Sequence, residues 1–268
     1  MAGTLIVLKG IVKDYPIVAA ANRDENKYRG GKEPQVIEEG KKIITPIDKM
    51  GGTWVGLNED GFVAGLTNKL TDISGEGHTS RGKLVLEALM MHNPEIAISH
   101  IKKEVEERRY NNFNLFLADR LEAHVVYYED GILRTETLGE GLKHVLTYGK
   151  INNMEDQKVA NTLMLLNESK ISANLPINDV IKELMGICSY HNELEHTKSI
   201  CVHSDESGTL SSTIIAVHKQ LMDSRLWHAE GNPCSSKYID YSSLIPQQNY
   251  RWQLFSNGNG TYQKYLKN

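Results

Sequence analysis

Short apolar runs of strand length, joined by polar turns, open the chain. The first two runs are Leu5 to Val12 and Ile17 to Ala21, and Lys13-Asp14-Tyr15-Pro16 lies between them. Aspartate and proline favour tight turns, so this segment predicts a β-hairpin with Pro16 at its turn. Similar runs between turn residues predict strands at residues 53–57, 62–67, 114–118, 123–128, 132–138, 199–203, 211–217, 224–229 and 250–255.

Four other segments repeat apolar residues every three or four positions, as on the buried face of a helix. Thr79 or Ser80 can cap the first of these helices at its N-terminus, and Pro94 suits the first turn of the second. The predicted helices cover residues 80–91, 94–108, 155–168 and 177–190.

The order of these elements predicts an α+β fold. Strands joined directly by short turns run antiparallel, which argues against a doubly wound parallel sheet. Two antiparallel sheets stacked face to face, with a helix pair on each outer face, would bury every apolar face. The chain contains no linker, repeat or low-complexity tract, so we expect a single domain over residues 1–268.

Composition and charge narrow the possible functions. The 268 residues carry a formal net charge of −4, and a near-neutral chain without a basic stripe is not expected to bind nucleic acid. No apolar run reaches the roughly 18 residues of a membrane span, and no secretory signal opens the sequence. The three cysteines, Cys188, Cys201 and Cys234, show no C-x-x-C spacing, so we expect a reducing, cytoplasmic setting.

Two motifs have simpler explanations than a binding site. The segment Gly77-His78-Thr79-Ser80-Arg81-Gly82-Lys83-Leu84 approaches a phosphate-binding loop, but Leu84 stands where a magnesium ligand is needed. A capped helix start explains it better. Histidines cluster near Cys188 and Cys201 without a recognisable zinc spacing, so we expect neither a metal nor a cofactor. These histidines are His191, His196 and His203.

The segment Asn22-Arg23-Asp24-Glu25 follows an apolar strand directly. A solvated turn with an Arg–Asp pair would explain three adjacent charges. Alternatively, Arg23 and Asp24 point into a cleft at the strand end, where burial makes their charges effective.

Several segments together resemble the NRDE family, which is also named after the Transport and Golgi organization 2 protein. The similarity extends from the first strand to about residue 215. The segments that carry it are PIVAAANRDE (16–25), GGTWVGLNEDGFVAGLTN (51–68), SRGKLV (80–85), FNLFL (113–117) and GTLSST (208–213).

The resemblance implies a branch of the N-terminal-nucleophile (Ntn) hydrolases, with a four-layer αββα fold and hydrolysis of a small non-peptide amide. In that superfamily the nucleophile is a cysteine at position 2, and its own α-amine acts as the base. The resemblance assigns thiolate stabilisation to Arg23 and orientation of the amine to Asp24. Asn68 is then the candidate donor of the oxyanion hole.

Position 2 departs from the family, because Ala2 has no nucleophilic atom. Either Ala2 replaces a cysteine of the natural chain, or the natural chain lacks the nucleophile. In the second case the resemblance implies a module that binds or carries a hydrophobic ligand such as haem, lipid or acyl-CoA. Trp54 would then contribute an apolar floor to the binding cleft, and Arg23 a cationic rim.

A second departure lies further along the chain. Family members carry another asparagine after Leu-Ser or Leu-Thr, whereas Leu146-Thr147 is followed here by Tyr148. Tyr148, Asn152 or Asn153 is left to supply that polar group. Lys158 matches the basic residue that the family places before valine, so Tyr148 and Lys158 are candidates for substrate binding.

Overall fold

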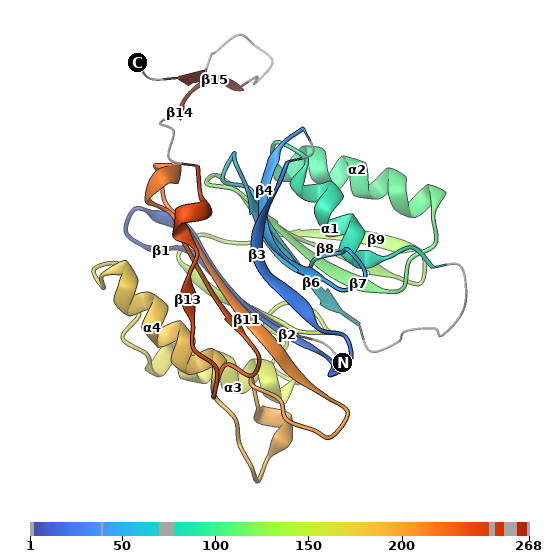
Figure 1. Ribbon diagram of the computed structural model, residues 1–268, viewed down its shortest axis with the longest axis vertical. Helices are drawn as coiled ribbons and strands as arrows, with labels where there is room; N and C mark the ends of the chain where they lie inside the picture. Colours follow the sequence, from blue (N-terminus) through green and yellow to red (C-terminus); the bar gives the residue numbers. More distant parts are fainter. Residues whose placement is uncertain (1–2, 39, 70–77, 247–249, 255–261, 267–268) are drawn as a thin grey trace.

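Two antiparallel sheets stack face to face, and a helix pair covers the outer face of each (Figure 1). This computed structural model describes residues 3–38, 40–69, 78–246, 250–254 and 262–266. The predicted α+β fold of two antiparallel sheets and four helices is confirmed.

The first sheet has six strands. Their spatial order is β10 (Leu142–Leu146), β1 (Thr4–Val12), β2 (Tyr15–Asn26), β11 (Ser207–Val217), β12 (Arg225–Glu230) and β13 (Ile239–Asp240). Its outer face packs against α3 (Gln157–Glu168) and α4 (Ile177–Cys188). The central strand β2 has a paired neighbour on each side, which holds its side chains in fixed positions.

The second sheet has seven strands in sequence order. They are β3 (Gly31–Glu38), β4 (Lys42–Asp48), β5 (Val55–Asn58), β6 (Val63–Asn68), β7 (Phe113–Ala118), β8 (Ala123–Glu129) and β9 (Ile132–Thr137). The helices α1 (Arg81–Leu89) and α2 (Pro94–Glu107) cover its outer face. Strands β14 (Tyr250–Leu254) and β15 (Tyr262–Leu266) form a separate two-stranded sheet.

Alternation of side chains divides the core into layers. In β1, Leu5 and Val7 face the second sheet, whereas Ile6 and Leu8 face α3 and α4. Successive residues of a strand point to opposite faces, so an uninterrupted apolar run can fill two layers at once. A third apolar layer lies between the second sheet and its helices.

The first hairpin differs in detail from its prediction. The turn is Lys13-Asp14, where Asp14 adopts a φ of 66°, and Pro16 lies within β2. Pro16 falls at an irregularity of the pairing between β1 and β2, a place where a missing N–H is tolerated. Strand β2 continues to Asn26, well beyond the predicted end at Ala21.

One predicted strand is wrong, and other strands were not foreseen. Residues 199–203 form a single bridge, from His203 to Gly208, because β2 and β12 already occupy both edges of β11. Strands β3, β4, β10, β13 and β15 were missed. Of these, β3 is largely exposed and charged, β4 contains a proline, β10 and β15 have only five residues each and β13 has two. No helix among the described residues is long and apolar enough to cross a membrane.

Candidate functional site

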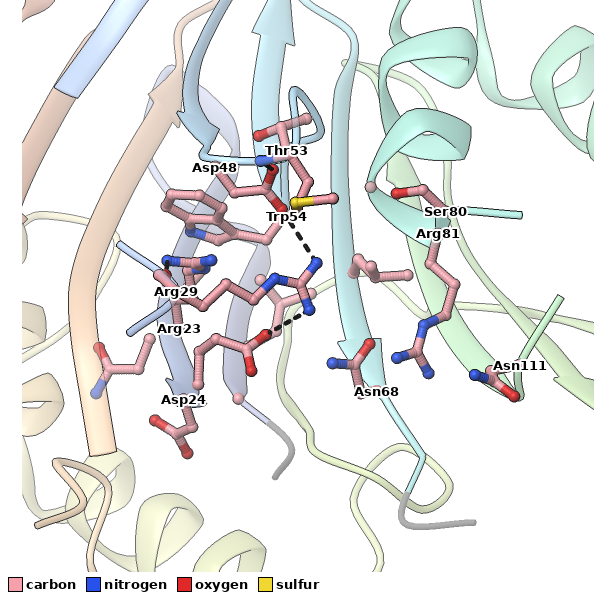
Figure 2. A pocket seen from close by; sticks show the side chains of 18 of the residues that line it. Arg23, Asp24, Arg29, Asp48, Thr53, Trp54, Asn68, Ser80, Arg81 and Asn111 are labelled. Atoms are coloured by element: carbon pink, nitrogen blue, oxygen red, sulfur yellow. Dashed lines mark hydrogen bonds and ion pairs between the residues drawn. The ribbon is translucent and has the colours of Figure 1, made fainter. Parts of the chain in front are cut away.

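A cleft of about 350 Å³ lies between the two sheets, beside the start of α1 (Figure 2). Strands β1 and β2 form one wall, and the segment after β4, the end of β6 and the first residues of α1 form the other. Most of its lining side chains are polar or charged. The lining residues include Thr4, Arg23, Asp24, Glu25, Arg29, Asp48, Trp54, Asn68, Arg81 and Asn111.

Arg23 and Asp24 lie inside β2, not at a strand end as expected from the sequence. Because they are consecutive residues of a strand, their side chains leave opposite faces of the sheet. Arg23 points between the sheets toward Trp54 (Figure 2). Asp24 points to the other face, where its carboxylate contacts Lys158 of α3. Backbone alternation thus separates the two charges, which do not pair with each other, although both residues line the cleft.

Arg23 brings a buried positive charge to the cleft. Its side chain stacks over Trp54, with 4.4 Å from Cζ to the ring centroid, and Nη1 donates a hydrogen bond of 2.9 Å to the Arg29 carbonyl. Burial lowers the pKa of Arg23, although a guanidinium stays charged near neutral pH. Among the described residues no carboxylate forms an ion pair with Arg23. This cation can therefore stabilise a negative group that enters the cleft.

Asp24 is held firmly from two sides. Thr209 Oγ1 donates to Oδ1 at 2.6 Å, and Lys158 Nζ donates to Oδ2 at 2.9 Å. Asp24 is only 4% exposed. The two hydrogen bonds, one of them from a cationic partner, give this buried carboxylate a fixed orientation, as a group that positions an amine requires. Lys158 contacts Asp24 and does not line the cleft.

A second charged group on the cleft wall was missed by the sequence analysis. Arg29 forms ion pairs with Glu25 at 3.1 Å and with Asp48 at 3.3 Å (Figure 2). Asp48 Oδ1 also accepts hydrogen bonds from the N–H groups of Met50 and Gly52. Arg29 lies in the turn between β2 and β3, and Asp48 is the last residue of β4. The two share no motif, so no local pattern could have linked them.

Arg81 and Asn111 also line the cleft and were not predicted. Arg81 Nη1 donates to the Asn112 carbonyl at 2.9 Å, which ties the start of α1 to the chain before β7. Arg81 lies within the SRGKLV segment that supported the family resemblance, so that segment contained a signal for it. Asn111 stands in a connection without periodicity and offered no such signal.

Two glycines position the loop that carries Trp54. A Cβ added at Gly52 would lie 2.9 Å from the backbone Cα and C of Gly82, so the two backbones touch. The Thr53 N–H donates to the Gly82 carbonyl at 3.1 Å across this contact. Gly82 thus allows the close packing of this loop against the start of α1. Ser80 is the N-cap of α1, which agrees with the prediction that this segment begins a helix.

Of the remaining predicted residues that the structure describes, one lines the cleft and the others do not. Asn68 lies at the end of β6 on the wall opposite Arg23, with its amide directed toward the cleft (Figure 2). Tyr148 is exposed and does not line the cleft. Asn152 and Asn153 bond to nearby backbone in the turn after β10 and thus support that turn.

Ala2 lies outside the described residues. Gly3, the next residue, lines the cleft, and a Cβ added to it would sit 3.6 Å from the backbone nitrogen of Asp24. No cysteine among the described residues lines the cleft. Burial raises the pKa of Cys188 and of Cys201 to about 12, so neither thiol is a ready nucleophile near neutral pH.

Comparisons with known proteins agree with this architecture. Residues 5–227 match the family model described as Transport and Golgi organisation 2. The Transport and Golgi organization protein 2 homologs of Bos taurus and Homo sapiens are each 30% identical to the chain. The bovine alignment covers 76% of this chain and 82% of that protein, and the human alignment covers 81% and 90%.

Among solved structures, the fold is similar to that of penicillin V acylase from Agrobacterium tumefaciens. The TM-score is 0.52 at 15% identity, over 94% of this chain and 90% of that one. At this identity the likeness concerns the fold alone. The family model and the two homologs show that the chain belongs to the Transport and Golgi organisation 2 family, on an Ntn-hydrolase-like fold.

Proposed function

We propose that this chain has the site of an Ntn-type amidohydrolase for a small, polar, non-peptide amide. The observation that carries the proposal is the convergence of Gly3, Arg23, Asp24 and Asn68 on one cleft. A residue at position 2 is bonded directly to Gly3, which lines the cleft. A nucleophile placed there would be next to the cation, the carboxylate and the amide that the chemistry needs.

Each group has a distinct role in the proposed reaction. Arg23 favours the thiolate form of a cysteine at position 2, because its buried charge has no carboxylate partner among the described residues. Asp24, held by Thr209 and Lys158, orients the α-amine that accepts the thiol proton. The Asn68 amide donates to the oxyanion that forms on the attacked carbonyl.

The lining of the cleft supports a polar substrate over a large apolar one. Arg23 covers one face of the Trp54 ring, so little apolar floor is left for a lipid or haem. Thr4 Oγ1 and Trp54 Nε1 are buried polar atoms without a hydrogen-bond partner among the described residues. A substrate with a carbonyl or carboxylate could use these groups, and with Ala2 in place the chain would bind it without cleaving it.

An Ala2→Cys variant tests the proposal. The parent chain is the matched control, because it shares Cys188, Cys201 and Cys234 and differs only by the thiol at position 2. We expect the variant to lose its initiator methionine, to gain one iodoacetamide-reactive thiol near neutral pH and to hydrolyse members of a panel of N-acylated small amines. Intact-protein mass and the rate of amine release measure these outcomes.

A second variant isolates the contribution of Arg23. In the Ala2→Cys background, Arg23→Leu should lower the rate of amine release by about 100-fold or more, since the cation no longer favours the thiolate. A folded Ala2→Cys chain with a free N-terminal cysteine that neither reacts with iodoacetamide nor cleaves any amide would contradict the hydrolase proposal.

The alternative is a module that binds a ligand through an acidic group. Arg23 favours it, because no carboxylate among the described residues forms an ion pair with it, and a carboxylate or phosphate of the ligand would supply that partner. Calorimetric titration of the Ala2 chain with haem, a fatty acid and an acyl-CoA would then show saturable binding that Arg23→Leu abolishes. Heats of dilution alone for all three ligands would exclude this function.

A further inference from the structure

A second cluster of chemically capable side chains lies outside the cleft. The ligand atoms of His191, His203 and Cys234 all lie within 4.8 Å of one another. Cys234 Sγ is 3.3 Å from His203 Nε2, and Cys201 Sγ is 3.5 Å from the same nitrogen. These four residues come from three separate segments of the chain, so no spacing in the sequence indicates the cluster.

The spacing of these atoms suits a tetrahedral metal ion. Zinc binds cysteine sulfur at about 2.3 Å and histidine nitrogen at about 2.0–2.1 Å, so a sulfur and a nitrogen on one tetrahedron lie about 3.6 Å apart. The distance of 3.3 Å between Cys234 Sγ and His203 Nε2 is close to that value. The rings of His191 and His203 meet edge to face, with centroids 5.2 Å apart, so both imidazoles approach the same point.

Hydrogen bonds to backbone carbonyls hold the three segments together. The N–H groups of Ile200 and Cys201 both donate to the Tyr190 carbonyl, which joins the segment of His203 to the end of α4 that precedes His191. Ser189 Oγ donates to the Pro233 carbonyl at 2.9 Å, which fixes the loop of Cys234 to the same helix end. Thus the donor atoms are already gathered in the fold, and a metal would not have to order the loops.

Access and outer contacts also fit a metal site. His191 and His203 are exposed, Cys234 is partly buried and Cys201 is fully buried, so the cluster has an open side and a closed side. The histidines and Cys234 line a surface cavity of about 330 Å³. His191 Nδ1 lies 3.4 Å from the Ser189 carbonyl, a contact of the kind that leaves Nε2 for a metal.

We propose that His191, His203 and Cys234 bind a zinc ion. Imidazole and thiolate together favour zinc over the hard cations magnesium and calcium, which prefer oxygen. On binding, Cys234 gives its thiol proton to solvent and forms a zinc–sulfur bond. The site is independent of the proposed hydrolase chemistry, because none of its ligands lines the cleft.

Metal binding by the full-length chain tests this proposal. The chain is reduced, stripped with a chelator and titrated with zinc in the calorimeter, and cobalt is added in parallel as a spectroscopic probe. We expect one zinc per chain, together with the sulfur-to-cobalt charge-transfer band and the visible bands of tetrahedral cobalt. Bound zinc should also protect Cys234 from iodoacetamide.

Point variants identify the ligands. His203→Ala and Cys234→Ser should each weaken zinc binding by more than about tenfold and remove the cobalt charge-transfer band or reduce it. His196→Ala is the matched control, since His196 is exposed in the same cavity but is not among the clustered donors, and it should bind zinc as the parent does.

Two results would overturn the assignment. One is a parent chain that is reduced and folded and still takes up no zinc. This holds also if Cys201 and Cys234 formed a disulfide before the reduction. The other is full-strength zinc binding by a His203→Ala/Cys234→Ser double variant, because the ion would then be held elsewhere. Circular dichroism of each variant confirms that the fold is retained.

Discussion

At the scale of single residues, hydrogen bonds fix the protonation state of some buried groups. His144 in β10 is 4% exposed, with Nδ1 at 3.2 Å from Asn152 Nδ2 and Nε2 at 3.4 Å from the Gly139 carbonyl. Asn152 Oδ1 accepts a hydrogen bond from the Val145 N–H, so the amide nitrogen must face the ring. The ring is therefore neutral, with its hydrogen on Nε2, because a proton on Nδ1 would face an amide donor.

This arrangement predicts a pH-dependent stability. Burial lowers the pKa of His144 below its ordinary value near 6.5; Lys9 lowers it further, whereas Glu136 and the Gly139 carbonyl oppose the shift. As the pH falls below about 6.5 the unfolded chain takes up a proton that the folded chain does not, so the free energy of unfolding decreases. The decrease continues until the pH reaches the pKa of the folded state.

Urea denaturation at about pH 7.5 and about pH 5.5 measures this effect. The parent should lose more stability between the two values than His144→Gln, by up to about 1 kcal/mol. His196→Gln, which replaces an exposed histidine, should behave as the parent does. Equal losses in the parent and in His144→Gln would show that His144 does not contribute to the pH dependence.

At the scale of elements, close contact between backbones sets the position of the cleft wall. The segment between β4 and β5 crosses the start of α1 at Gly52 and Gly82, and no side chain fits between them. Trp54 follows directly and supports Arg23. Glycine is therefore required at positions 52 and 82 because the two backbones touch, and not because either backbone needs a positive φ.

A glycine-to-alanine pair tests this contact. Gly52→Ala should lower the free energy of unfolding by about 1–3 kcal/mol, since its Cβ would push against the backbone of Gly82. Gly186→Ala is the control: Gly186 lies on the exposed side of α4 with no atom near the added Cβ, and it should stabilise the chain by about 0.5–1 kcal/mol. If both variants lost stability equally, the close contact would not be the cause.

At the scale of the whole molecule, the layer between the two sheets joins the halves that form the cleft. Phe116 of β7 is fully buried in this layer, together with residues of β1, β2 and β11. The cleft lies beside this apolar layer, and its walls keep their spacing because the sheets cannot slide without exposing the core. The charged site is thus supported by the packing of this layer, to which Trp54 also belongs.

Truncation of one side chain measures that support. Phe116→Ala should cost about 3–5 kcal/mol in the free energy of unfolding, because it leaves a cavity between the sheets. Ile132→Ala on the edge strand β9 removes a side chain that is 54% exposed and should change stability by less than about 0.5 kcal/mol. Chemical denaturation would give both values, and a small loss for Phe116→Ala would mean that the layer repacks.

The outcome for individual elements shows how far the sequence pattern reaches. The hairpin at 53–67 and the helix that starts at Pro94 were predicted well, because turn residues and apolar periodicity act over a few neighbours. Strand β3 was missed, since its exposed edge position requires no apolar alternation. The strand predicted at 199–203 failed because the edge it would have paired with is occupied by strands from elsewhere in the chain.

The same division holds for the sites. The sequence by itself determined the local elements, the antiparallel order and the charged segment at Arg23 and Asp24. Tertiary structure alone decided that β2 continues through Arg23 and Asp24, that Arg29 and Asp48 join them at the cleft, and that the cluster around His203 forms. The physical reason is distance: local patterns report the nearest residues, whereas a site is made by side chains that packing brings together from remote parts of the chain.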